Sequence, residues 1–172
     1  MKTTKRPRLG TTASALVLSL ALFSLFALFA GVARASHYAI ADVPRLITSV
    51  QVDKLHKAKI NTTEELLGRA AKAKDRKALA KASGLPGSEL LDLARRADLL
   101  RIKGVGAEMV LLFEAAGVKS TADLVKQDAA LFMTAVTNAN KTAKITEKPP
   151  TEPQLSDWIG QAKQLPQVLE TK

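Results

Sequence analysis

The chain has 172 residues, with 26 lysines and arginines against 16 aspartates and glutamates, and it contains no cysteine. This length suits one small domain with short extensions. Because cysteine is absent, the chain has no disulfide, no thiolate metal site and no lipid-attachment site of the bacterial lipoprotein type, so packing alone must hold the fold.

Residues 1–35 have the composition of an export signal, and we expect a signal helix there. A basic start precedes an apolar stretch over residues 15–30, and the small-x-small pattern Ala33-Arg34-Ala35 follows. We expect cleavage before Ser36. An uncleaved membrane anchor stays open, because the apolar stretch is just short of the roughly 20 residues that span a bilayer. Either way, residues 36–172 are expected to be exported, periplasmic or secreted, and to touch a membrane only through an uncleaved N-terminus.

From Tyr38 to Leu169 the apolar spacing is helical almost throughout, which predicts an all-α domain. Thr62 and Glu65 form a capping-box pattern that predicts the start of a helix. A helix is expected to end at Gly84, and another is expected to follow Pro86-Gly87-Ser88.

A further helix is predicted after residue 106, ending at Gly117 as its C′ glycine. Ser120 and Asp123 then repeat the capping pattern. After a break at Pro149-Pro150, Thr151 and Gln154 predict a last helix with one apolar stripe, formed by Leu155, Trp158, Ile159 and Ala162. Trp158 has two interpretations: it packs this closing helix onto the core, or it binds a partner.

Two glycines, Gly104 and Gly106, lie between two of these predicted helices. Because glycine reaches positive φ without steric cost, the pair predicts a tight hairpin held to the core by Val105. Such a hairpin can cradle a phosphate or can simply join two helices.

Sliding the chain by 58 residues reveals a repeat. The apolar positions of residues 47–60 align with those of residues 105–118, and the cap at Thr62 aligns with the cap at Ser120. Leu46 and Thr48 align with Gly104 and Gly106, so the first copy lacks the glycines.

Two copies of helix, turn and helix resemble tandem helix-hairpin-helix domains. The stretches LLRIKGVGAEMVLLFEAAGVKSTADL, DRKALAKASGL and PTEPQLSDWIGQAKQLP also resemble, in that order, an uncharacterised bacterial family of unknown function. The resemblance implies one compact all-α domain over residues 36–172, with repeat one at about 40–70, connecting helices at 71–99, repeat two at about 100–128 and closing C-terminal helices at 129–172.

Helix-hairpin-helix modules are known as sequence-independent DNA binders, and the resemblance implies a phosphate site at the second hairpin. Backbone amides there would meet a phosphate, aided by the helix dipole. The implied residues are Gly104, Val105 and Gly106, with Arg101, Lys103, Arg95 and Arg96 supplying salt-dependent attraction. A second basic cluster, either an extension of this site or a solvated helix face, comprises Lys72, Lys74, Arg76, Lys77 and Lys81.

Glu108 weakens the nucleic-acid interpretation, because its carboxylate would repel a phosphate at the same amides. No catalytic motif appears, and neither histidine, His37 or His56, has metal ligands at suitable spacing. We therefore expect a non-enzymatic binding or assembly module without metal or cofactor, which binds another protein of the cell envelope. The alternative is binding of nucleic acid or another polyanion.

Overall fold

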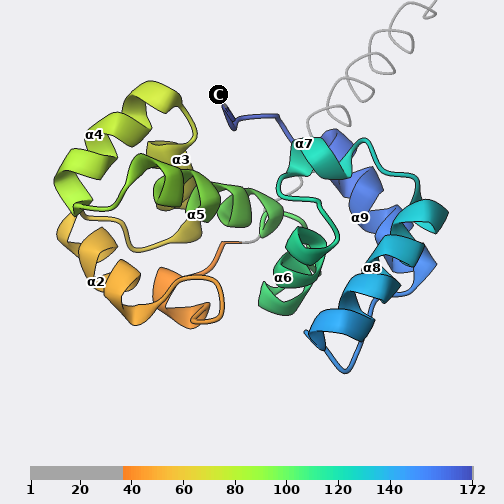
Figure 1. Cartoon of the computed structure of the whole chain (residues 1–172). Helices are drawn as coiled ribbons and strands as arrows, with labels where there is room; N and C mark the ends of the chain where they lie inside the picture. The colour runs from red at the N-terminus through yellow and green to blue at the C-terminus, as the bar shows by residue number, and fades with distance from the viewer. Residues whose placement is uncertain (1–36, 172) are drawn as a thin grey trace, which may run out of the picture. The chain divides into compact units, whose positions relative to one another are not determined.

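The computed structural model describes residues 37–171, which belong to a compact unit extending from Ala35 to Lys172. The predicted signal segment, residues 1–35, lies outside the described residues. The described part is all-helical, as predicted (Figure 1). Its helices are η2 (Ile40–Asp42), α2 (Ser49–Lys57), α3 (Thr63–Ala70), α4 (Ala73–Ser83), α5 (Gly87–Leu99), α6 (Ala107–Ala115), α7 (Thr121–Leu124), α8 (Ala129–Ala143) and α9 (Glu152–Gln164).

None of the helices in residues 37–171 has the length and apolarity of a membrane span. Extended pairing within the same range is limited to a single bridge between Ala39 and Thr62.

Local capping sets most helix starts. Thr62 with Glu65, and Thr151 with Gln154, form the reciprocal capping boxes predicted for α3 and α9. Ser120 accepts a hydrogen bond from the amide of Asp123 at the start of α7, also as predicted. These hydrogen bonds satisfy first-turn amides that would otherwise lack partners.

The same backbone pattern ends α2 and α6, whose bounds differ by 58 residues. Ile60 donates to the Leu55 carbonyl, and Val118 donates to the Phe113 carbonyl. The residue just before each donor is left-handed: Lys59 has a φ of 61° and Gly117 has a φ of 88°. Gly117 is therefore the predicted C′ glycine, whereas Lys59 adopts a left-handed conformation that is costly for a residue with a side chain.

The connections before α2 and α6 differ. Residues 43–48 follow the short η2 and bury Leu46, whereas residues 100–106 follow α5 and leave the aligned Gly104 exposed. Thr48 caps α2 in a box with Gln51, but Gly106 gives α6 no side-chain cap. The two segments thus share their second helix and diverge at the turn before it.

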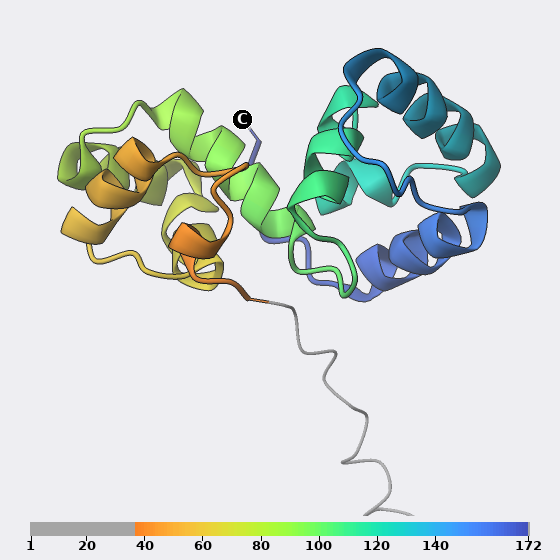
Figure 2. The same cartoon turned by 90° about the horizontal axis from the view of Figure 1, so that it is seen from below.

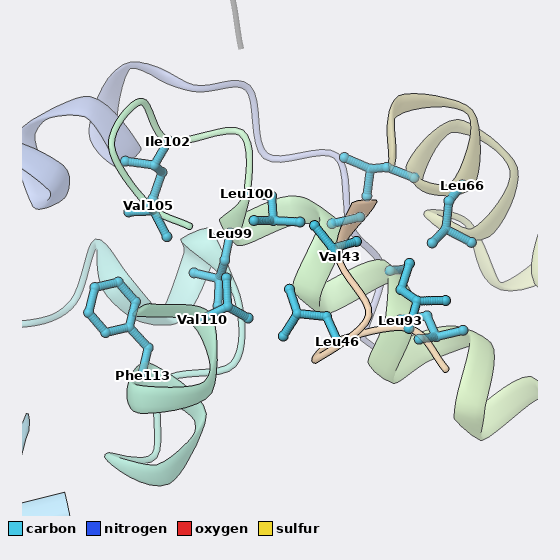
Figure 3. Close-up of a cluster of buried hydrophobic side chains, with 14 of the residues drawn as sticks. Val43, Leu46, Leu66, Leu93, Leu99, Leu100, Ile102, Val105, Val110 and Phe113 are labelled. Carbon is cyan, nitrogen blue, oxygen red and sulfur yellow. The ribbon is translucent and has the colours of Figure 1, made fainter. Parts of the chain in front are cut away.

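Helix α5 lies at the centre of the described unit. It packs on α3 and α4 at one side and on α7 at the other, while α6 packs on α8 and α8 packs on α9 (Figures 1 and 2). Buried side chains from α5, from the turn after it and from residues 43–46 form one cluster, which Figure 3 shows with Leu99 and Leu100 near its middle. This cluster fixes the position of the turn before α6.

The last residues form an extended C-terminal tail, residues 165–171, that returns from α9 to α3 and α4. The Glu170 amide donates to the Ala71 carbonyl at 2.9 Å, and the Glu170 carboxylate accepts from the Ala73 amide at 2.9 Å. Helix α4 has no cap from the side chain before it, Lys72. The C-terminal tail therefore supplies the cap of a helix far away in the sequence.

Candidate functional site

The candidate site is the turn between α5 and α6. Val105 at its centre is fully buried, and its amide donates to the Ile102 carbonyl at 3.1 Å. Figure 3 shows Val105 and Ile102 extending from the turn into the apolar cluster. The turn is thus held to the core by Val105.

The two glycines of the turn have different conformations. Gly104 has a φ of 90°, as expected, but Gly106 has a φ of −102°, so the expectation of positive φ is wrong at the second position. A Cβ at Gly104 would lie 3.1 Å from Nε1 of Trp158, whereas a Cβ at Gly106 would meet nothing within 4 Å. Glycine is therefore required by backbone and space at Gly104 only.

Helix α9 covers one side of the turn. Trp158 is 6% exposed and contacts Phe113 edge-on, with ring centroids 5.8 Å apart. Of the two interpretations of Trp158, the burial and this contact favour a core residue that packs α9 onto the turn and α6.

Gln161 follows Trp158 by three residues in α9. Both the oxygen and the nitrogen of its side-chain amide bind the backbone of Lys103 in the turn. Its Oε1 accepts from the Lys103 amide at 2.9 Å, and its Nε2 donates to the Lys103 carbonyl at 3.2 Å. The sequence analysis did not identify Gln161, because a glutamine on a helix surface carries no signal of a partner 58 residues away. One amide of the turn is therefore already occupied from within the chain.

Arg101 is 9% exposed and points into the domain. Its Nη1 donates to Asp98 at 2.7 Å and to the Pro166 carbonyl at 3.1 Å. Asp98, 1% exposed, also accepts from the amide and the hydroxyl of Thr121. This buried network joins α5, α7 and the C-terminal tail.

The other two arginines beside the turn also have carboxylate partners. Arg96 contacts both carboxylate oxygens of Glu114, at 2.9 and 3.2 Å, and donates to the Leu46 carbonyl. Arg95 pairs with Asp92 at 3.0 Å. Among the candidate cations near the turn, Lys103 alone has no ion pair within residues 37–171.

Glu108 lies in the first turn of α6, where its charge favours the helix dipole. Arg45 donates to its carboxylate at 2.7 Å, and the Thr146 hydroxyl donates to its other oxygen at 2.7 Å. Arg45 also donates to the Ile145 carbonyl. The Glu108 carboxylate thus takes part in a group of side-chain hydrogen bonds that joins residues 43–48, α6 and the segment after α8.

The second basic cluster divides into buried and exposed members. Arg76 is buried, and its guanidinium donates to the carbonyls of Ala70 and Ala71, both at 2.8 Å. The exposed members, none with an ion pair among the described side chains, are Lys72, Lys74, Lys77 and Lys81. The last three share one face of α4, since their spacing is three and four residues.

In its described part the chain is thus a small all-helical domain whose candidate site is a glycine-containing turn covered by a closing helix. The chain belongs to the family described as Domain of unknown function (DUF4332), whose model matches residues 45–165. The predicted resemblance to a family of unknown function is confirmed by this match. No curated protein and no solved structure matched the chain significantly.

Proposed function

We propose that this chain is an exported, non-enzymatic module of tandem helix-hairpin-helix type that binds another protein in the cell envelope, in the periplasm or after secretion. The sequence of residues 1–35 supports export. The shared ends of α2 and α6, 58 residues apart, support two related units. The two units would lie at about residues 40–70 and about residues 100–128, as the sequence predicts.

The observation that carries this proposal is the internal use of the second hairpin. Gln161 binds the Lys103 amide, Trp158 lies beside the exposed Gly104, and Arg101 is paired inside the domain. Of the groups that the resemblance assigns to a phosphate, Lys103 and Gly104 thus contact the closing helix α9, and Arg101 is bound to Asp98 and Pro166. A hairpin that joins helices in this way suits a rigid assembly module better than a nucleic-acid-binding site.

An exposed face of α8 is a candidate surface for the protein partner. Leu131 is 75% exposed, and Ala135, Asn138 and Thr142 follow it on the same face at helical spacing. The last three line a shallow groove of about 510 Å³ beside Ala115 and Ala116 of α6. Small side chains along a groove allow a partner helix to approach closely, and exposed apolar side chains favour protein contact.

The proposal can be tested by site-specific photo-crosslinking in cells that make the protein. A crosslinking side chain at Asn138, in the groove, should capture one defined envelope protein, and Leu131→Asp should remove that adduct. A crosslinker at Gln164, exposed at the end of α9, is the matched control. The same adducts from both positions, or no protein adduct at Asn138, would contradict protein binding at this surface.

A second candidate function, polyanion binding, is favoured by the unpaired charges that the fold leaves exposed. They include Lys103 beside the turn and the lysine face of α4, formed by Lys74, Lys77 and Lys81, none of which has an ion pair among the described residues. The start of α6 also lacks a side-chain cap. The Glu108 carboxylate would repel a phosphate bound there. Of the four cations implied by the resemblance, Arg95, Arg96 and Arg101 already pair with carboxylates.

Titration of the protein with duplex DNA at two salt concentrations separates the two candidates. Polyanion binding predicts an affinity that falls steeply with salt and is weakened by Gly106→Asp or Lys103→Ala. Replacing Lys74, Lys77 and Lys81 together by glutamine distinguishes the helix face from the turn. Affinity that is insensitive to salt and to all these substitutions would exclude both surfaces.

A further inference from the structure

A cavity of about 410 Å³ lies between α3 and the C-terminal tail. Its apolar wall consists of Leu67 and Ala71, with Val168 of the tail held over it and 40% exposed. Cavities of roughly 300–1,000 Å³ are typical of small-molecule sites. The size and the apolar wall therefore suit a small molecule.

Gly68 lines this cavity from the interior of α3. Glycine is less stable than alanine within a helix. Neither backbone nor packing explains the glycine, because its φ is not positive and a Cβ there would meet nothing within 4 Å. Gly68 is exposed, and because it has no side chain it leaves the α3 backbone accessible to a ligand in the cavity.

Arg101 gives the cavity a cationic inner end. It lines the cavity while being nine-tenths buried, and its hydrogen bonds within the described residues all come from Nη1. Since none of the buried side-chain nitrogens described lacks a partner, its other donors, Nε and Nη2, must reach solvent. A guanidinium with two donors on one edge suits a carboxylate.

The other charges at the cavity lie at its rim. Lys72 is exposed, and Glu64, with a side chain 70% exposed, lies 3.7 Å from Nε2 of His37. Asp98, behind Arg101, has both oxygens engaged. The buried Asp98 carboxylate offsets the charge of Arg101, so the guanidinium serves a ligand in the cavity chiefly as a directional hydrogen-bond donor.

We propose that this cavity binds a small carboxylate with a short apolar chain, the carboxylate on Arg101 and the chain over Gly68 beneath Val168. The binding does not depend on the protein partner proposed above. The ligand would also contact the C-terminal tail and would hold it against α3.

Calorimetric titration of the full-length protein with sodium octanoate tests the proposal, with 1-octanol as the uncharged probe. We expect saturable octanoate binding that Gly68→Leu weakens at least tenfold, because the leucine fills the cavity. Gly160→Leu is the matched control, since Gly160 lies within α9 and its Cβ would also meet nothing within 4 Å. The control should bind octanoate like the parent protein.

Circular dichroism checks that Gly68→Leu is folded, and Val168→Asp, at an exposed position, provides a second variant that places a negative charge over the cavity. The proposal is overturned if octanoate shows no saturable binding, or if Gly68→Leu and Val168→Asp both bind it like the parent. Equal affinity for 1-octanol would overturn the assignment of Arg101 as carboxylate ligand.

Discussion

Replacing Gly104 by alanine tests the account of the turn most directly. A left-handed residue with a side chain costs about 1–2 kcal/mol. The new Cβ would lie 3.1 Å from Nε1 of Trp158, whose ring is buried against Phe113 and cannot move freely, and overpacking of this kind costs about 1–3 kcal/mol. Alanine also restricts the unfolded chain more than glycine does, which offsets about 0.4–1 kcal/mol of this loss. We therefore expect the free energy of unfolding to fall by about 1–5 kcal/mol.

Gly106→Ala is the matched control, because Gly106 has a negative φ and open space at its Cβ. Alanine restricts the unfolded chain, which stabilises the protein, but it is a poorer N-cap than glycine, which destabilises it. Because these two effects nearly cancel, we expect the free energy of unfolding to change by less than about 1 kcal/mol. Urea denaturation of both variants can be followed by fluorescence, since Trp158 is the only tryptophan. Equal destabilisation by the two substitutions would refute the distinction drawn between the two glycines.

Three further substitutions test other contacts. Lys59→Gly should raise the free energy of unfolding by about 1 kcal/mol in thermal denaturation, because it removes left-handed strain; destabilisation would contradict the assigned φ of 61°. Asp98→Ala should lower it by about 3 kcal/mol, since Arg101 would remain buried without its carboxylate; Asp92→Ala, at the exposed Arg95 pair, is the control and should change it by less than about 1 kcal/mol. Glu170→Ala, which removes the side-chain acceptor, should speed hydrogen exchange of the Ala73 amide while leaving exchange in α9 unchanged; unchanged exchange at Ala73 would refute the cap.

The parts of the fold that the sequence predicted depend on local spacing. Thr62 and Glu65 are three residues apart and cap α3 as expected, and Gly117 ends α6 for a reason that lies within one helical turn. Periodicity likewise placed Leu155 and Ile159 on the buried face of α9. Such features need no knowledge of the rest of the chain.

The candidate site was harder to predict, because its residues differ in partners that lie far away in the sequence. Arg101 and Lys103 look equivalent as cations beside the turn, yet Arg101 is buried on Asp98 and Pro166 whereas Lys103 is exposed. Gln161 has no pattern of its own. Long-range packing decides which charges remain available, and a single sequence does not encode that packing in local spacing.

The C-terminal cap on α4 has a consequence for how the protein matures. The Ala73 amide is satisfied by Glu170, which is 97 residues later in the chain. Because synthesis starts at the N-terminus, α2 and α3 can form early, but α4 receives its cap only after the chain has been made as far as Glu170. A change at Glu170 therefore acts on the start of α4, 97 residues earlier in the chain.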